Sequence, residues 1–93
     1  MNKKNIIQIR RKLDKLDNLF LDLIKKRTKL VDLVIKNKKY KKDIIDKKRI
    51  SVILLNIKKK SLKKKIDPKI TNKVWSNMIK AYIDYEFRNF KKK

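Results

Sequence analysis

The sequence predicts an all-α protein, a three-helix protomer with a long first helix that intertwines with a second copy in a dimer. Three observations support this fold class. The 93 residues include no glycine and one proline, so the chain lacks the turn-rich texture of a β-sandwich and any glycine-rich phosphate loop. Apolar residues recur at spacings of three and four along the first third of the chain. Later in the chain, Asp67-Pro68 is a strong helix-start signal.

The first helix is expected to run from about residue 5 to about residue 39. Its apolar seam persists for four heptads, which indicates packing against another helix. The seam consists of Ile6, Ile9, Leu13, Leu16, Phe20, Leu23, Leu30 and Val34. Such a helix is about 50 Å long, whereas a compact chain of this length is about 25 Å across, twice its radius of gyration. One protomer cannot bury the seam, so we expect a homodimer with a twofold axis.

Two shorter helices are expected to follow. The second runs from about residue 46 to residue 62, with Asp46 as its N-cap. Its buried face carries Ile50, Ile53, Leu54 and Ile57. The third begins with Asp67 as N-cap and Pro68 at the first helical position, and ends near Phe90. Its inner stripe carries Ile70, Val74, Trp75, Met78, Ile79 and Tyr82.

Residues 58–65, KKKSLKKK, have little apolar face, and we expect them to fray towards solvent. The chain shows no internal repeat and no change of composition typical of a linker. Residues 1–93 are therefore expected to form a single helical domain, with only a small core because the chain is short.

The composition excludes several kinds of chemistry. The chain has no cysteine and no histidine, which removes disulfides, thiolates, the commonest general base and the commonest metal ligand. We expect neither a metal nor a cofactor. No apolar run is long enough to span a bilayer, and the basic N-terminus lacks a signal-peptide core. A cytoplasmic protein that does not bind membranes is the resulting expectation.

The net charge of +22 suggests a nucleic acid or another polyanion as partner. The excess is lysine, however, and lysine, asparagine and isoleucine share A/T-rich codons while glycine codons are G/C-rich. A coding bias explains the charge without a polyanionic partner, so the five arginines and the sole glutamate are more informative. A basic helical dimer that binds nucleic acid stays open as an alternative. It is disfavoured because clustered arginines and interleaved aromatic residues are missing, and we expect no specific nucleic-acid partner.

Arg27 occupies a seam position, with Leu23 and Leu30 one turn away on either side. It either fixes the register of helix packing or lays its stem along the seam with its head in solvent. The other interpretation is a cation that holds an anion in a cavity. We favour that one, because a buried arginine without a partner is costly.

Lys38 lies eleven residues after Arg27, which is three helical turns, so the two share nearly one face. Taken alone, Lys38 is as well explained as a solvated surface charge. Glu86 follows Trp75, Ile79 and Tyr82 at spacings of four, three and four, which puts it on the inner face of the third helix. Its alternative is a carboxylate at a helix end that reaches a nearby lysine.

Arg10 precedes Arg27 by seventeen residues, or about 25 Å along a helix. The two can therefore hold one small ligand only if Arg10 comes from a second, antiparallel copy. Otherwise Arg10 is an exposed residue paired with Asp14. From spacing alone, Asp46 and Arg49 are best explained as an N-cap and a surface pair.

These residues form a cationic group without a nucleophile or an imidazole. Such a group suits a unimolecular rearrangement or elimination of a small polyanion, driven by positioning and electrostatics. In order, the chain presents IRRKLDKLD (9–17), LIKKR (23–27), Lys38, D-x-x-R (46–49) and an acid-capped third helix. This pattern spans nearly the whole chain and resembles the all-helical AroQ class of chorismate mutases.

The resemblance implies an intertwined dimer of three-helix protomers that converts chorismate, a dianion, to prephenate in aromatic amino-acid biosynthesis without a cofactor. It also implies residue roles. Arg10 matches the arginine supplied by the partner chain, and Arg27 matches the carboxylate-binding arginine of the same chain. Lys38 matches the lysine that contacts the ether oxygen and a carboxylate. Asp46 and Arg49 match the pair on the second helix that lines the pocket.

At three positions, the chain departs from the residue that is usual in the family or has one of its less common residues. Ile50 stands where family mutases usually have a glutamate that contacts the ring hydroxyl of the substrate. Tyr82 stands where many have a serine near the ring carboxylate. Glu86 matches the glutamine or glutamate that hydrogen-bonds to the breaking ether oxygen. A glutamate there must be protonated to donate, while Lys38 favours its ionised form, so we expect activity to fall as pH rises through neutrality.

Ile50 also keeps a second reaction open. Isochorismate-pyruvate lyase has the same fold, lacks the same glutamate, and eliminates pyruvate to leave salicylate. The stretch AYIDYE (81–86) is also similar to the third helix of the lyase. Chorismate mutase is the first prediction, and the lyase is the nearest alternative.

Overall fold

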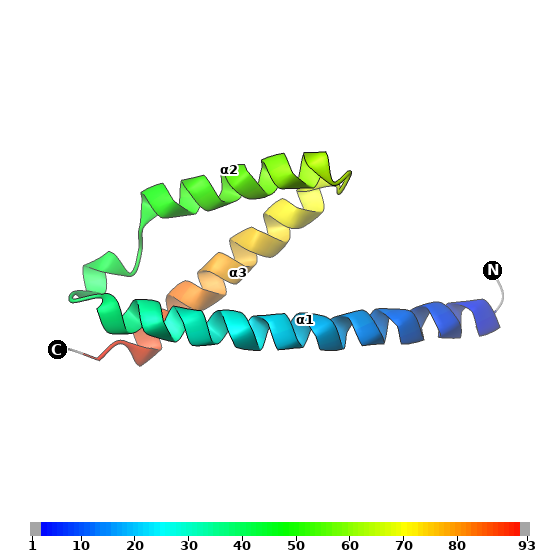
Figure 1. The fold of residues 1–93 in the computed structure, drawn as a ribbon, viewed down its shortest axis with the longest axis horizontal. Coiled ribbons are helices and arrows are strands. Elements are labelled where there is room, and N and C mark those ends of the chain that lie inside the picture. The colour runs from blue at the N-terminus through cyan, green and yellow to red at the C-terminus, as the bar shows by residue number, and fades with distance from the viewer. Residues whose placement is uncertain (1–2, 92–93) are drawn as a thin grey trace. The chain divides into compact units, whose positions relative to one another are not determined.

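The computed structural model describes residues 3–91. The elements in order are α1 (Lys3–Asn37), a 3-10 turn η1 (Lys41–Asp43), α2 (Lys47–Lys63) and α3 (Pro68–Asn89) (Figure 1). No strand occurs within the described range, and each helix ends within about two residues of its expected bounds. The predicted all-α fold with three helices is confirmed, while the intertwined dimer stays a prediction.

The chain divides into two compact units, Met1–Asp32 and Leu33–Lys93. The boundary lies inside the uninterrupted helix α1, so the division does not coincide with a loop or linker. The single domain expected over residues 1–93 therefore stays a prediction. Each unit is described below by itself.

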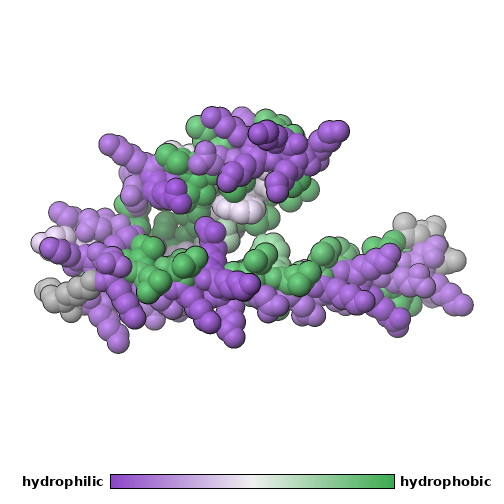
Figure 2. All heavy atoms as spheres, in the orientation of Figure 1, coloured by the Kyte–Doolittle hydropathy of each residue, from purple (hydrophilic) through white to green (hydrophobic). Residues whose placement is uncertain are grey.

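The first unit consists of the longer part of α1, whose apolar seam lies open in the single chain. Leu16 is 59% exposed and Leu23 is 63% exposed, which is far from the burial expected of seam leucines. Figure 2 shows hydrophobic residues along α1 between hydrophilic ones. A seam of this length and exposure is typical of a surface that packs against another chain.

In the second unit, α2 packs against α3. The four residues predicted for the inner face of α2 are half-buried: Ile50, Ile53, Leu54 and Ile57. Burying one such side chain stabilises the fold by about 1.5–3 kcal/mol when burial is complete. Because these side chains are only partly buried, each contributes less than that in the single chain.

The predicted inner stripe of α3 is right for four residues and wrong for two. Trp75, Met78, Ile79 and Tyr82 are half-buried, but Ile70 is 60% exposed and Val74 is 38% exposed. Successive residues of an α-helix are turned by about 100°, so Ile70 is rotated by about 140° from Trp75. It therefore cannot share the inner face of the helix.

The prediction that residues 58–65 fray is wrong as far as Lys63, where α2 ends. Ser61 is only 3% exposed, and its hydroxyl donates to the Ile57 carbonyl at 2.6 Å. The same Oγ lies 2.8 Å from the Oγ1 of Thr71 on α3. This buried hydrogen bond ties the end of α2 to the start of α3, where the sequence suggested only solvated lysines.

Lys65 lies in the connection between α2 and α3 and has a left-handed backbone conformation, with φ of 59°. The Ile66 N–H returns to the Ser61 carbonyl at 2.8 Å and closes the end of the helix. Glycine usually occupies such a position, and this chain contains none. Lys65 therefore adds a local backbone strain of roughly 1–2 kcal/mol.

Both predicted N-caps are present. The Asp46 carboxylate accepts from the Arg49 backbone N–H at 3.0 Å, and the Asp67 carboxylate accepts from the Lys69 N–H at 2.9 Å, with Pro68 opening α3.

Among residues 3–91, no helix combines the length and the apolar character that crossing a membrane would require.

Candidate active site

The site begins where α1 ends. The Asn37 side chain donates to the Leu33 carbonyl at 2.8 Å, and the Lys38 N–H donates to the Ile35 carbonyl at 3.1 Å. Ile35 is buried at 6% exposure, which fixes the last turn of the helix in the second unit. Lys38 therefore follows a well-anchored helix end, and it is half-buried.

Glu86 lies near the end of α3 and is 8% exposed, which makes it a buried carboxyl. The Lys38 Nζ donates to its Oε1 at 3.0 Å, although the two residues are 48 positions apart. The inward position expected from the spacing of Trp75, Ile79 and Tyr82 agrees with this burial. The structure thus brings together the two residues that the sequence suggested for catalysis.

This ion pair is largely shielded from water. The side chain of Lys38 is 20% exposed and that of Glu86 is 11% exposed. Removing one partner of a fully buried pair costs roughly 3–5 kcal/mol, because the other charge is left without compensation. The cost is smaller here, since both groups keep some contact with solvent.

A second contact of Lys38 was not foreseen. Its Nζ donates to the Ile44 carbonyl at 3.4 Å, and the Ile44 side chain is buried at 3% exposure. The sequence offers two adjacent isoleucines in a polar connection, and no periodicity there distinguishes one from the other. Ile45, the neighbour, is 47% exposed.

The start of α2 carries three of the predicted binding residues. Asp46 and Arg49 are exposed, and Ile50 is half-buried. The Arg49 backbone N–H donates to the Asp46 carboxylate at 3.0 Å. The predicted N-cap is present, and the pocket-lining role of these residues stays a prediction.

Tyr82 lies one turn before Glu86 on α3 and is half-buried. Its ring meets the ring of Tyr85 edge to face, with centroids 6.2 Å apart and planes at 84°. This arrangement is a favourable geometry for aromatic pairs. The bulky phenol of Tyr82 thus occupies the position where the sequence resemblance leads us to expect a small serine in many family members.

Arg10 and Arg27 belong to the first unit. Arg10 is exposed, and within residues 3–91 the recorded ion pairs do not include Arg10 with Asp14. Arg27 is half-buried, unlike most of its neighbours on α1. Both lie on one continuous helix, so their guanidinium groups cannot meet on a small ligand within one chain.

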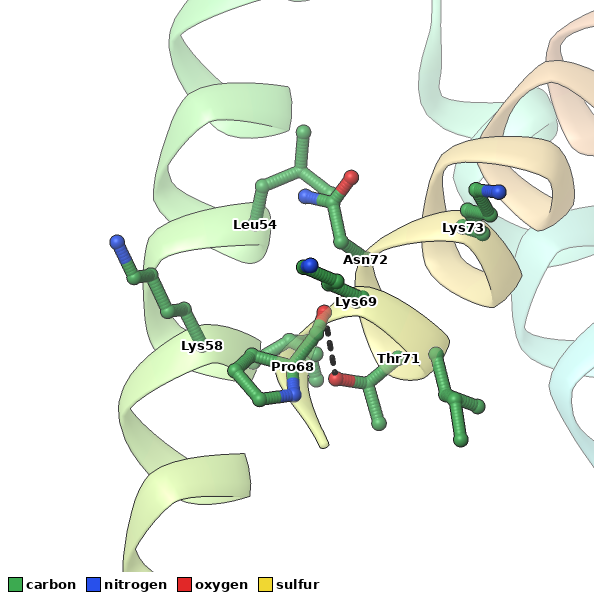
Figure 3. A pocket seen from close by; sticks show the side chains of 9 residues that line it. Leu54, Lys58, Pro68, Lys69, Thr71, Asn72 and Lys73 are labelled. Atoms are coloured by element: carbon green, nitrogen blue, oxygen red, sulfur yellow. Dashed lines mark hydrogen bonds between the residues drawn. The ribbon is translucent and has the colours of Figure 1, made fainter. Parts of the chain in front are cut away.

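A separate cavity of about 550 Å³ lies between α2 and α3. Figure 3 shows Leu54 of α2 on the side of the first turns of α3, whereas the ammonium end of Lys58 points away from them. Its lining is Leu54, Ile57, Lys58, Pro68, Lys69, Ile70, Thr71, Asn72 and Lys73. The lining includes no carboxylate and none of the predicted site residues, so we do not assign the reaction to this cavity.

Comparison with protein families gives the identity. The model of the family chorismate mutase type II matches residues 9–87. The chain belongs to this family. The matched range includes every predicted site residue, from Arg10 to Glu86. Membership makes the protein an isomerase of the chorismate mutase type that acts on a small molecule. Curated proteins and solved structures gave no significant match.

Proposed function

We propose that this protein rearranges chorismate to prephenate. The observation that carries the proposal is the shielded pair of Lys38 and Glu86 in a chain of the chorismate mutase family. The reaction breaks an ether C–O bond and forms a C–C bond within one molecule, so it requires no nucleophile. It is accelerated by groups that hold the substrate folded and stabilise charge on the ether oxygen.

In this proposal, the N–H of Lys38 that is used by neither Glu86 nor the Ile44 carbonyl is directed at the substrate, where it contacts the ether oxygen and a carboxylate. Glu86, when protonated, donates a second hydrogen bond to the same oxygen. The 3.0 Å contact between Lys38 and Glu86 supports this role, since both groups already converge on one point. Charge-assisted donors in a site that excludes water are stronger than the same groups in water.

Arginines supply the affinity for the two carboxylates. Arg27 binds from the same chain, and Arg10 is contributed by a second copy packed along the exposed seam of α1. The exposure of the seam leucines supports this dimer, as does the distance between the two arginines along α1. Asp46, Arg49 and Tyr82 line the remaining sides. A cytoplasmic location stays a prediction.

The alternative reaction is isochorismate-pyruvate lyase activity. Ile50 favours it, because a half-buried isoleucine at the start of α2 offers no acceptor for a ring hydroxyl. The same cations would bind isochorismate, another dianion of the same size. The choice between the two reactions therefore depends on how the ring is held rather than on the charged groups.

One experiment tests both reactions. The protein is incubated separately with chorismate and with isochorismate, and the products are identified by chromatography and mass spectrometry. Prephenate from chorismate supports the mutase. Salicylate and pyruvate from isochorismate, with little turnover of chorismate, would replace it by the lyase.

Inactivity on both substrates would contradict both enzymatic proposals. Binding to duplex DNA or RNA that persists at high salt would then favour the basic helical dimer. Binding seen only at low salt carries no weight, because a net charge of +22 produces it without specificity.

A further inference from the structure

We infer that Ile44 is a positioning residue, which fixes its own backbone carbonyl against Lys38 and thereby orients the ammonium group of that lysine. The inference rests on the proposed function, in which Lys38 contacts the reacting ether oxygen. It concerns a residue outside the charged set, in the connection between α1 and α2.

The connection has a defined backbone. After Lys38, the 3-10 turn η1 is closed by two hydrogen bonds, from the Asp43 N–H to the Tyr40 carbonyl at 3.0 Å and from the Ile44 N–H to the Lys41 carbonyl at 3.1 Å. Two residues later, Asp46 caps α2. The carbonyl of Ile44 is thus held from both sides.

Burial selects Ile44 over its identical neighbour. Ile44 is 3% exposed and Ile45 is 47% exposed, so only the first is anchored by its side chain. The anchored residue is the one whose carbonyl lies 3.4 Å from the Lys38 Nζ. This distance is long for a hydrogen bond, but the contact joins a full charge to a dipole in a shielded place.

The contact completes a specific geometry at the ammonium group. A lysine ammonium has three donors, and among the described residues Glu86 and the Ile44 carbonyl occupy two of them. Two fixed acceptors determine the direction of the third N–H. With Glu86 alone, the group would be free to rotate, because the lysine stem is flexible.

The first test compares matched side-chain variants, Ile44→Ala and Ile45→Ala. Ile44→Ala is expected to lower kcat on the order of 10-fold, because a misplaced donor loses rate steeply. KM should change much less, since the positive charge remains. Ile45→Ala should retain the kcat of the unaltered protein, and Ile44→Val should recover most of the activity lost in Ile44→Ala.

A second variant removes the acceptor without touching a side chain. The α-hydroxy analogue of isoleucine at position 45 makes the Ile44 carbonyl part of an ester, which is a weaker acceptor than an amide. The Ile45 N–H that is lost makes no backbone hydrogen bond within the described range. We expect a reduced kcat with an unchanged melting temperature.

A third measurement does not depend on activity. In protein labelled with ¹⁵N-lysine, the ammonium signal of Lys38, assigned by its loss in Lys38→Arg, should broaden in the ester variant. An unchanged signal would overturn the inference even if neither reaction were observed.

Equal kcat values for the two alanine variants would overturn it as well. If Ile44→Ala does not fold, the ester variant decides. The unaltered protein could also be inactive while the Lys38 ammonium signal is broadened in the ester variant. That result would contradict the proposed function but would support the positioning of Lys38 by Ile44.

Discussion

Glu86 and Lys38 lie 3.0 Å apart with opposite charges, yet the proposed reaction requires Glu86 as a hydrogen-bond donor. An ionised carboxylate accepts hydrogen bonds and cannot donate one, whereas a protonated carboxyl group can donate. In the proposed reaction, Glu86 therefore acts as a donor only in its protonated form.

Glu86→Gln tests this role. The amide donates at every pH, so the fall in kcat/KM above neutrality should disappear in the variant. The measurement is a pH profile of kcat/KM for both proteins between about pH 5 and pH 9. Asp84→Asn is the matched control, since this exposed carboxylate pairs with Arg88 on the same helix. If the pH profile of Glu86→Gln has the same shape as that of the unaltered protein, Glu86 is not the protonated donor to the ether oxygen.

Arg27→Ala is expected to lower kcat/KM on the order of 100-fold or more, because it removes a charged donor to a substrate carboxylate. The far-UV circular dichroism and the molecular mass in solution should stay unchanged. Arg11→Ala, at an exposed position of the same helix, serves as control. If the variant loses its oligomeric state together with its activity, Arg27 is a packing residue instead.

At the scale of elements, a buried serine and a left-handed lysine characterise the connection between α2 and α3. Ser61 is hydrogen-bonded to Ile57 and Thr71, and Lys65 accepts a left-handed backbone in a chain that has no glycine. The strain at Lys65 is local and independent of the charged groups. Its removal should therefore change stability without changing the reaction.

Lys65→Gly is expected to raise the free energy of unfolding by about 1 kcal/mol, because glycine adopts a positive φ without a steric penalty. Lys64→Gly is the control, since Lys64 has φ of −87° and gains nothing from glycine. Urea unfolding at one fixed protein concentration measures both. If Lys64→Gly stabilises the protein as much as Lys65→Gly does, the proposal that the backbone of Lys65 is strained would be wrong.

The helices were predictable because their apolar spacing repeats over several turns and Asp46 and Asp67 supply caps. Two features of the second unit were not. Apolarity alone could not show that Ser61 is buried, because a hydroxyl becomes compatible with burial only once Thr71 lies across from it. Ile44 and Ile45 are chemically identical in a segment without periodicity, so only the folded backbone distinguishes them.

For the candidate site, spacing was enough to place Glu86 inward, and the resemblance to a family was needed to single out Lys38 among so many lysines. Their contact could not be predicted, because it joins residues 48 positions apart through the packing of the second unit. The role of Arg10 depends on a second chain, whose position is not fixed by the spacing of residues within one chain.

At the scale of the whole molecule, the proposed active unit contains two copies. Each chain has a net charge of +22, so the dimer would carry twice that, +44. Such a charge attracts a dianionic substrate but also repels the second copy. Added salt screens both effects, so it should strengthen the dimer and slow substrate capture at the same time.

Mixing two inactive variants tests the shared site. In a random mixture of Arg10→Ala and Arg27→Ala, half of the dimers contain one chain of each kind, and each of these has one intact site. Activity should therefore return to about a quarter of that of the unaltered protein. Enzyme assays before and after mixing measure it. No recovery, once native mass spectrometry shows mixed dimers, would contradict sharing.

The exposed seam of α1 has a consequence for how the enzyme is assayed. If the site forms only when two copies meet, the catalyst itself obeys a binding equilibrium, and specific activity depends on protein concentration. Below the dissociation constant of the dimer, velocity should fall with the square of the enzyme concentration rather than in proportion to it. The seam leucines would then set the lowest concentration at which the protein works.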